Sequence, residues 1–477
     1  MRARSSLVTL AVLASLGTLV TLGAAGGCSF SRFNDFKNDT PVFAFANKSF
    51  GVHVGVSTNP DGAAFLGTAG NVGEGSRTFA LRDGRADPSG DPLSNQAVCL
   101  LNSEEVSAGR ACLGAQTLVG LGALTDSAGL HPGCFAVGYG KTTDDSTVLP
   151  GPVAHCTDGH VFTLGAVSSG PDTTKDTAPA LTVAFANRDE AAIRKLSISF
   201  ATLPIGGGAN PALLLGDESD NTAYVYKSIS AGAPPTLLLR PSKANGFGRS
   251  VALGKGAGGT LFAVGAPGDG EVYVFFGDPA QPDKIVPVGC AGDGVAGSGE
   301  SIALGDVDGD RIDDLLVAQG SGGARAVQIY LGKDAPTAKV TTECANAWAP
   351  SALVLKCEDT RGAGGCANDA DFGRSIAIGD LDKDGFAEVA VGAPKASADG
   401  NGGAGVVFLY TPSKSSAVAD VRYLGKPDGG AGFGTSVAIG AVGTQDTLAV
   451  AAPGTGKSYV VWCTNLPGAP TGPRCRK

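Results

Sequence analysis

The chain has 477 residues, of which 73 are Gly and 27 are Pro, and 43% of its residues are hydrophobic. This composition disfavours long helices, because each Gly costs a helix about 1 kcal/mol relative to Ala, and it favours many short strands joined by tight turns. The formal net charge is -9 and the sequence contains no basic run, which argues against a nucleic-acid partner, since phosphate contacts need clustered Lys and Arg.

The first 27 residues have the pattern of an export signal. A basic start is followed by an uncharged apolar stretch at 7–22 and by small residues that lead to Cys28. This arrangement resembles the lipobox of bacterial lipoproteins, whose Cys becomes the acylated N-terminus, although Ala25 stands where that family usually has Leu. We therefore expect a signal peptide at 1–27, lipidation at Cys28 and a tether at 28–40. Such a protein would be exported and held at the cell envelope, on the outer membrane or cell surface.

Two other interpretations of the N-terminal segment remain open. Cleavage after one of the small residues would give a freely secreted protein. Retention of the segment would give a transmembrane anchor, for which its length and its Gly and Ala content are marginal.

The N-terminal half contains three weak copies of a repeated unit, at 50–81, 118–165 and 198–226. Each copy is a series of short apolar runs bounded by turn residues, which is typical of strands. Two similar apolar segments, 42–47 and 183–187, each precede a unit, as Thr236–Arg240 precedes the next one. We interpret such segments as the outermost strand of the preceding unit.

The C-terminal half contains four clear copies of the same unit. Each has a strand that follows Phe-Gly or a related pair, a tight loop, a strand that ends in a Gly-Ala-Pro-type turn, and a third strand rich in β-branched and aromatic residues. The copies occupy 247–276, 298–331, 372–410 and 433–463. Because a lone small sheet is marginally stable, we expect the units to pack radially against one another.

The Phe-Gly and Gly-Ala-Pro pairs at this distance resemble the FG-GAP repeat of integrin α-subunits and of many bacterial exported proteins. The resemblance is firm over 247–462 and loose over 41–246. It implies an all-β fold, a seven-bladed β-propeller of four-stranded antiparallel blades, over 41–463. The tail at 464–477 is rich in Pro and cannot supply a ladder strand, so we expect residues 41–46 to complete the last blade and close the ring.

Two acidic loops follow the first strands of their units, at 306–314 and 380–388. Acidic side chains at positions 1, 3, 5 and 9 would repel one another unless they shared a hard cation with oxygen ligands. An EF-hand would need Glu at position 12, where these loops have Val317 and Val391. The candidate ligands, with position 7 contributing its backbone carbonyl, are Asp306, Asp308, Asp310, Ile312, Asp314, Asp380, Asp382, Asp384, Phe386 and Glu388.

The spacing of both loops resembles the calcium-binding DxDxDGxxD loop of integrin propellers. The resemblance implies two structural Ca²⁺ ions that tie a hairpin on one propeller face. The second loop matches at every position, with Glu388 at its end, whereas the first has Arg311 where the motif has Gly. Arg311 would cost about 1–2 kcal/mol in a left-handed conformation, so we expect the 380–388 loop to bind calcium better.

After Cys28 is set aside, ten Cys remain. Disulfides are the default for them in an exported chain, and close pairs such as Cys463 with Cys475 or Cys357 with Cys366 are natural candidates.

The two His at 155–160 lie near Cys134 and Cys156, and we interpret this region as a disulfide-linked loop instead of a catalytic pair. Residues 451–458 loosely fit a nucleotide-binding loop, but a strand follows them where a helix would be needed, so we expect no nucleotide.

These observations favour a non-enzymatic protein that acts in binding, adhesion or scaffolding, with no catalytic residue assigned. The expected partner is a protein or a glycan at one propeller face, beside the membrane reached through the lipid anchor. The alternative is a carbohydrate-active enzyme, a lyase or hydrolase, with its site in the propeller channel. Such an enzyme would need converging acids, bases or a metal from several blades, whereas the acidic clusters fall in the two loops and only 4 His occur in the chain.

Overall fold

The structure is a computed structural model, and it describes part of the chain. The described residues are 43–44, 53–58, 64–69, 78–82, 97–99, 115–126, 129–139, 153–155, 161–163, 196–205, 208–218, 221–226, 236–237, 245–277, 285–320, 326–340, 344–357, 370–381, 387–397, 403–410, 421–424, 430–442 and 445–462. Within these ranges the chain forms strands and short 3₁₀ turns, with no α-helix.

The described strands form seven four-stranded antiparallel sheets, here called blades 1 to 7 in chain order. Blades 1 to 3 consist of β2 (His53–Thr58), β3 (Ala64–Ala69), β4 (Thr78–Arg82) and β5 (Ala97–Cys99); β6 (Ala115–Asp126), β7 (Gly129–Tyr139), β8 (Val153–His155) and β9 (Val161–Thr163); and β10 (Leu196–Ile205), β11 (Gly208–Asp217), β12 (Thr222–Tyr226) and β13 (Thr236–Leu237). Each blade is a meander in which consecutive strands pair with each other.

Blades 4 to 7 follow the same plan. They consist of β14 (Ser250–Gly256), β15 (Gly259–Ala266), β16 (Glu271–Gly277) and β17 (Val286–Gly292); β18 (Ile302–Gly305), β19 (Asp314–Ala318), β20 (Ala326–Tyr330) and β21 (Val354–Lys356); β22 (Ser375–Gly379), β23 (Glu388–Ala393), β24 (Val406–Tyr410) and β25 (Val421–Leu424); and β26 (Val437–Val442), β27 (Gln445–Ala452) and β28 (Lys457–Trp462) with β1 (Phe43–Ala44).

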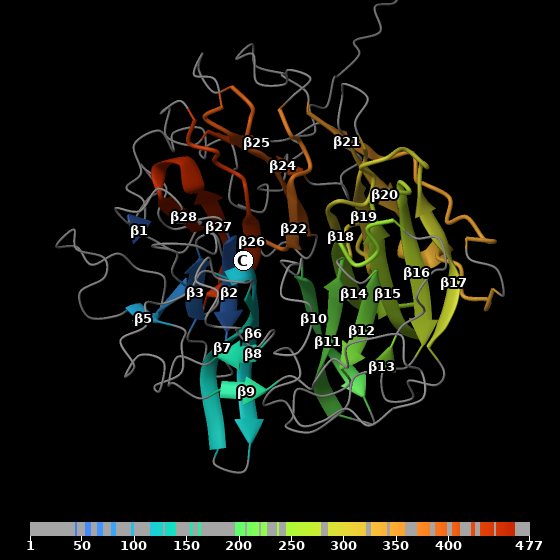
Figure 1. Cartoon of the computed structure of the whole chain (residues 1–477), viewed down its shortest axis with the longest axis horizontal. Helices are drawn as coiled ribbons and strands as arrows, with labels where there is room; N and C mark the ends of the chain where they lie inside the picture. Colours follow the sequence, from blue (N-terminus) through green and yellow to red (C-terminus); the bar gives the residue numbers. More distant parts are fainter. Residues whose placement is uncertain are drawn as a thin grey trace, which may run out of the picture.

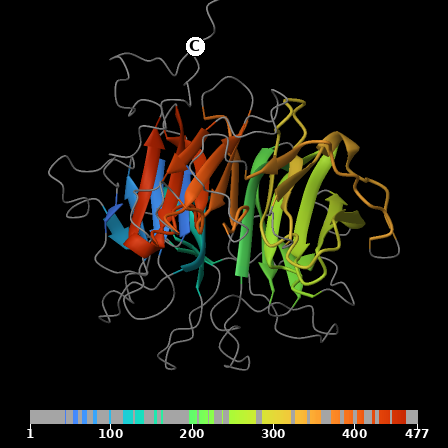
Figure 2. The ribbon, with the colours of Figure 1, turned by 90° about the horizontal axis from the view of Figure 1, so that it is seen from above.

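The first strands of the blades surround the centre of a ring. They contact one another in the order β2, β6, β10, β14, β18, β22 and β26, and β26 contacts β2 again. Figure 1 looks down on this ring, with its sheets arranged around the centre, and Figure 2 shows the same sheets from the side. The fold is therefore the all-β propeller of four-stranded antiparallel sheets that the repeats predict.

The ring is closed by pairing between the two ends of the propeller. Phe43 lies opposite Ser458 and Ala44 opposite Lys457, so β1 forms the outer strand of blade 7 (Figure 1). This pairing confirms that a segment within 41–46 completes the last blade. Closure removes the exposed outer edge that β28 would otherwise present.

One prediction for the N-terminal half is wrong. The outer strand of blade 2 is β9 (Val161–Thr163), so the outer-strand position assigned to 183–187 is already filled. The third strand of that blade is β8 (Val153–His155), which pairs with β7. Residues 183–187 themselves lie outside the described residues. Thr236–Leu237 does form an outer strand, that of blade 3.

The repeated Phe packs against the third strand of its own blade. Phe247 is buried and meets the ring of Tyr273 edge-on at 5.4 Å. Phe433 meets Tyr459 in the same way at 5.2 Å, and both rings are buried. Phe372 repeats the contact with Phe408. Such edge-to-face pairs contribute about 0.5–1.5 kcal/mol beyond the area that they bury, which explains why this position in the repeat is aromatic.

The Gly and Ser of the repeat join one blade to the next. Gly248 has a φ of +94°, and a Cβ on it would lie 2.8 Å from the backbone nitrogen of Asp217, so only Gly fits. The Ser250 hydroxyl donates to the carbonyl oxygen of Gly299 in blade 5 at 2.6 Å. Ser375 makes the equivalent bond to Gly434 at 2.9 Å. The Gly and Ser of the repeat are therefore explained by contacts between neighbouring blades.

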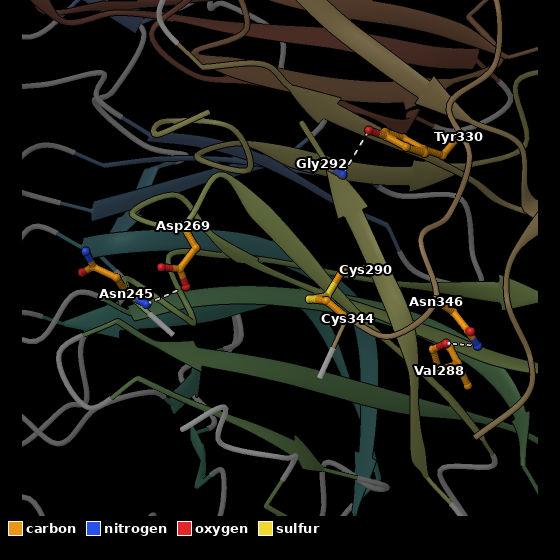
Figure 3. The surroundings of a disulfide bond; sticks show 8 residues. All are labelled: Asn245, Asp269, Val288, Cys290, Gly292, Tyr330, Cys344 and Asn346. Carbon is orange, nitrogen blue, oxygen red and sulfur yellow. Dashed lines mark hydrogen bonds between the residues drawn. A yellow bond between two sulfur atoms is a disulfide. The ribbon is translucent and has the colours of Figure 1, made fainter. Parts of the chain in front are cut away.

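A disulfide joins Cys290 on β17 to Cys344, which lies between β20 and β21 (Figure 3). Beside it the chain runs along the outer edge of β17: the Cys290 amide donates to Asn346 at 2.9 Å, and the Trp348 amide donates to the Cys290 carbonyl at 2.7 Å. The Asn346 side chain also donates to the Val288 carbonyl. A segment of blade 5 thus covers the open edge of blade 4.

The other cysteine predictions meet the structure only in part. Disulfides were expected, but the pairing of Cys290 with Cys344 was not among the named candidates. Cys357 is disulfide-bonded as well. Its proposed partner Cys366, and the proposed pair Cys463 with Cys475, lie outside the described residues.

Candidate metal centre and axial ion pairs

The loop between β18 and β19 brings carboxylates together. One oxygen from each of Asp306, Asp308 and Asp314 lies within 4.8 Å of the others. Gly305 and Asp314 are paired across the hairpin, which fixes the two ends of the loop opposite each other. The Asp310 carboxylate accepts a hydrogen bond from the Ile312 amide at 2.8 Å. The first predicted ligand loop is therefore compact and contains a cluster of three of its four acidic ligands.

Backbone amides of the loop itself hold its first carboxylate. Asp306 Oδ1 accepts hydrogen bonds from the amides of Gly309 at 2.7 Å and Asp310 at 3.1 Å, and Oδ2 accepts one from Arg311 at 2.7 Å. Hydrogen bonds to a charged carboxylate are short and strong, and these three wrap the loop around Asp306. The chain is thereby arranged around the acidic cluster by its own hydrogen bonds.

The last carboxylate of the loop is buried. Asp314 Oδ2 accepts from the Val307 amide at 2.9 Å, and Oδ1 accepts from the Gly332 amide at 2.7 Å. Burial raises the pKa of Asp314 to about 6, against the effect of these two hydrogen bonds, and the nearby charges of Asp308 and Asp310 raise it further. A buried carboxyl among like charges gains most from a cation.

Arg311 occupies the strained position that the sequence predicts. Its φ is +70°, in the left-handed region where side chains other than Gly are disfavoured, and Gly309 two residues earlier has a φ of +83°. The loop therefore adopts the backbone shape expected of the motif, although Arg replaces its Gly.

A lysine from a different turn contacts this cluster. Lys333 lies in the 3₁₀ turn η3 (Gly332–Asp334), and its ammonium is 2.7 Å from Asp308 Oδ2. This pairing raises the pKa of Lys333, mainly through the hydrogen bond with Asp308. Lys333 lies well beyond the loop in sequence, so the spacing of the loop does not reveal this contact.

The second predicted loop is described only at its ends. Glu388 is buried, and its Oε2 accepts from the Leu381 amide at 2.8 Å, which repeats the bond from Val307 to Asp314 in the first loop. Gly379 and Glu388 are paired across the hairpin. Asp380 is described, whereas the predicted ligands Asp382, Asp384 and Phe386 lie outside the described residues.

The donor set of the first loop suits a hard cation. All three clustered ligands are carboxylates, and neither His nor Cys takes part. Oxygen-only ligands are those that Ca²⁺ prefers, while Zn²⁺ sites usually include nitrogen or sulfur. The residues that would hold calcium in this chain are thus the predicted ones of the first loop, with the ends of the second arranged alike.

A second cluster of charges joins four successive blades, with Glu218 just after the second strand of blade 3 and the other three residues just before the first strands of blades 4, 5 and 6. Glu218 pairs with Arg249 at 3.2 Å, Arg249 with Glu300 at 3.2 Å, and Glu300 with Arg374 at 2.9 Å. We call these four residues the axial ion-pair chain. Arg249, Glu300 and Arg374 each follow the Gly that begins their repeat, so aligned repeats could have revealed the alternating charges.

His53 on β2 lies within the electrostatic influence of this chain. Burial, and then the positive charge of Arg374, lower the pKa of His53 to about 4. The imidazole is therefore neutral at pH 7. The axial region combines two Glu, two Arg and this neutral His from blades 1, 3, 4, 5 and 6.

Two remaining predictions concern segments away from these clusters. Phe135 and His155 lie opposite each other on β7 and β8, next to Cys134, while Cys156 and His160 lie outside the described residues. The segment that loosely fits a nucleotide-binding loop is a turn between β27 and β28, with the 3₁₀ turn η5 (Pro453–Thr455) at its centre. Among the described residues, no helix has both the length and the apolar character needed to cross a membrane.

Comparison with known proteins agrees with this architecture. The family described as FG-GAP repeat matches residues 372–410, which comprise the first three strands of blade 6 and the acidic loop between β22 and β23. Integrin alpha-7 of Homo sapiens is 32% identical over 224 residues, covering 43% of this chain and 16% of the human protein. The chain thus spans a small part of the length of that relative.

The matches among solved structures include two with low TM-scores. The Dos1 propeller has 11% sequence identity and a TM-score of 0.36, with 69% of this chain and 70% of that chain covered. Sqt1 from Chaetomium thermophilum has 12% identity and a TM-score of 0.38, with 83% and 76% covered.

The sheets and their cyclic contacts define the class of this protein, a β-propeller built from sequence repeats. Within that class, residues 372–410 match the FG-GAP repeat, and 43% of the chain is similar to integrin alpha-7.

Proposed function

We propose that this chain is a non-enzymatic, calcium-binding propeller that acts in binding, adhesion or scaffolding at the cell envelope. The observation that carries the calcium part is the convergence of Asp306, Asp308 and Asp314 in a loop already shaped by its own amides. The binding part is supported by the fold, a closed ring that presents its loops on two faces, and its partner would be a protein or a glycan. The similarity to integrin alpha-7 supports a surface location.

A calcium titration of the mature protein tests the metal sites. We expect two binding events by calorimetry and a higher melting temperature in calcium than in EDTA, because a ligand bound only by the native state adds RT ln(1 + [L]/Kd) to stability, about 2.7 kcal/mol at a hundredfold excess over Kd. Asp382→Ala should remove the tighter event and Asp308→Ala the weaker one. Asp334→Ala, which removes an exposed acid outside both loops, is the matched control. Equal melting in calcium and EDTA would contradict the proposal.

A pull-down from envelope extracts tests the binding role. The same bait is compared in calcium and in EDTA, with the doubly substituted Asp308→Ala, Asp382→Ala chain as control. A partner retained by the wild type in calcium and lost in both other conditions is the expected result. Partners that bind all three baits equally would show that calcium has no part in recognition.

The proposed location depends on Cys28, which lies outside the described residues. Intact mass of the membrane fraction should show a diacylglyceryl addition that Cys28→Ala abolishes. Two or more acyl chains anchor a protein stably, whereas one does not. A mature protein that is unmodified and freely soluble would favour the secreted alternative.

The axial ion-pair chain is the one observation that favours the alternative, a carbohydrate-active enzyme with its site at the centre of the ring. Acids and bases from several blades converge there, as such a site requires. Each carboxylate is nevertheless paired with Arg, an arrangement suited to joining blades. Glu300→Gln separates the two roles: we expect a loss of stability of about 0.5–1 kcal/mol that high salt mimics in the wild type. Polysaccharide cleavage by the wild type that this substitution abolishes would instead establish the enzyme.

A further inference from the structure

The Lys333 ammonium and a divalent cation would need the same carboxylate. Lys333 Nζ lies 2.7 Å from Asp308 Oδ2, and the other oxygen of Asp308 accepts from the Asp310 amide at 3.1 Å. Both oxygens of Asp308 are therefore engaged within the protein, yet Asp308 is one of the three clustered carboxylates. A cation entering the cluster must share Asp308 with Lys333 or displace it.

The position of Lys333 is fixed by the loop that it contacts. The preceding residue, Gly332, donates its amide to Asp314 Oδ1 at 2.7 Å, so the turn η3 is attached to the end of the acidic loop. A Cβ on Gly332 would lie 2.3 Å from the carbonyl oxygen of Asp313, and only Gly allows this approach. The Lys333 side chain is 48% exposed and can leave Asp308 for solvent at little steric cost.

The excess of negative charge in the loop favours a positive group such as the Lys333 ammonium beside it. Five Asp residues occur in 306–314, against Arg311 alone among the basic residues of that stretch. Lys333 supplies a second positive charge from outside the loop, and it does so at Asp308. An ammonium is a compact point charge on a flexible stem, and it can be exchanged for a metal ion without rearranging the backbone.

We propose that Lys333 is a built-in competitor for the metal at the 306–314 loop. In low calcium its ammonium neutralises Asp308, and rising calcium displaces it. The loop is then a weak, graded calcium site, in contrast to a permanently occupied structural one. This inference rests on the proposed calcium binding and names the residue that sets the affinity of the first loop.

The test is a calcium titration by calorimetry of the full mature chain and of two variants. Lys333→Met removes the competing ammonium and should tighten the weaker binding event about two- to fivefold, the range that exposed ion pairs contribute. Lys339→Met removes the same charge from an exposed position nearby and measures the general effect of net charge. The tighter event, assigned to the 380–388 loop, should be unchanged in both variants.

The possible results separate this inference from the proposed function. Equal tightening in Lys333→Met and Lys339→Met, or no change in either, overturns the competition while calcium binding stands. Binding at the second loop alone, in the wild type and in Lys333→Met, overturns it as well. Absence of any calcium binding in all three proteins would overturn the proposed function itself. A melting curve of each variant in EDTA confirms that the substituted chains are folded.

Discussion

Lys255 and Asp313 hold each other by two hydrogen bonds of opposite sense. The Asp313 amide donates to the Lys255 carbonyl at 2.8 Å, and the Lys255 amide donates to Asp313 Oδ2 at 2.6 Å. Lys255 lies on β14 in blade 4, whereas Asp313 is the last residue before β19 in blade 5. The acidic loop is thereby joined to the neighbouring blade at its C-terminal end.

Asp313→Ala should therefore destabilise the propeller. The substitution leaves the Lys255 amide without its side-chain acceptor, and such a loss costs about 1 kcal/mol. Denaturant unfolding at pH 7 measures the change, with Asp334→Ala as control because Asp334 is exposed on η3. Unfolding midpoints that agree between the Asp313 variant and wild type would show that the bond pair contributes nothing.

Acidification should weaken the fold through His53. Its pKa is lowered from 6.5 to about 4 in the folded protein, because burial and Arg374 both disfavour the imidazolium. A base with a depressed folded pKa contributes stability that is present above pH 6.5 and is lost as the pH falls toward 4. The full shift corresponds to about 3 kcal/mol, and partial exposure reduces it.

Thermal melting between pH 7 and pH 4 measures this dependence. His53→Gln cannot gain a proton and should flatten the curve over that window. His131→Gln is the matched control, since it removes a different imidazole from the same half of the chain. Parallel curves for wild type and His53→Gln would assign the acid sensitivity to other groups.

Arg311→Gly should stabilise the first acidic loop. At a φ of +70° the Arg side chain costs about 1–2 kcal/mol, and Gly recovers this less the 0.5–1 kcal/mol of extra entropy in the unfolded chain. We expect a net gain of up to about 1 kcal/mol in EDTA. Arg311→Ala removes the same charge without relieving the backbone, so it should give no gain. Equal effects of the Gly and Ala variants would mean that charge, not conformation, is responsible.

Removal of residues 29–46 should destabilise the whole ring. The deletion takes away β1, the outer strand of blade 7, and exposes the edge of β28. A deletion of 29–38, which keeps β1, is the control for shortening the tether. A single melting transition at a lower temperature is expected for the longer deletion only. Melting like that of the intact protein would show that β1 does not contribute to closure.

The repeated residues predict the fold because they make the same contacts in several blades. Phe247 and Phe433 make the same contact with the third strand of their own blade, and the Gly after each has a φ above +90°. The N-terminal half was harder to interpret, because 183–187 resembles the true outer strand at 42–47 while β9 at Val161–Thr163 fills that role in blade 2. A composition like that of a true outer strand does not show which of two segments pairs with the third strand of a blade.

The candidate site was predictable only where its residues are close in sequence. The cluster of Asp306, Asp308 and Asp314 follows from loop spacing alone. Lys333 reaches it from the next hairpin turn, and the axial ion-pair chain connects residues of different blades, so neither follows from local spacing. The disulfide between Cys290 and Cys344 spans 54 residues, and a sequence with many Cys does not specify connectivity.

The pairing of Phe43 with Ser458 also sets an order of events during biosynthesis. The first strand of the propeller is made early, yet its partner is translated roughly 20–80 s later at about 5–20 residues per second. Throughout that interval the nascent ring has two unpaired edges. β1 must therefore remain available until β28 has been made, so the last blade can be completed only after the strands of the other six blades have been translated.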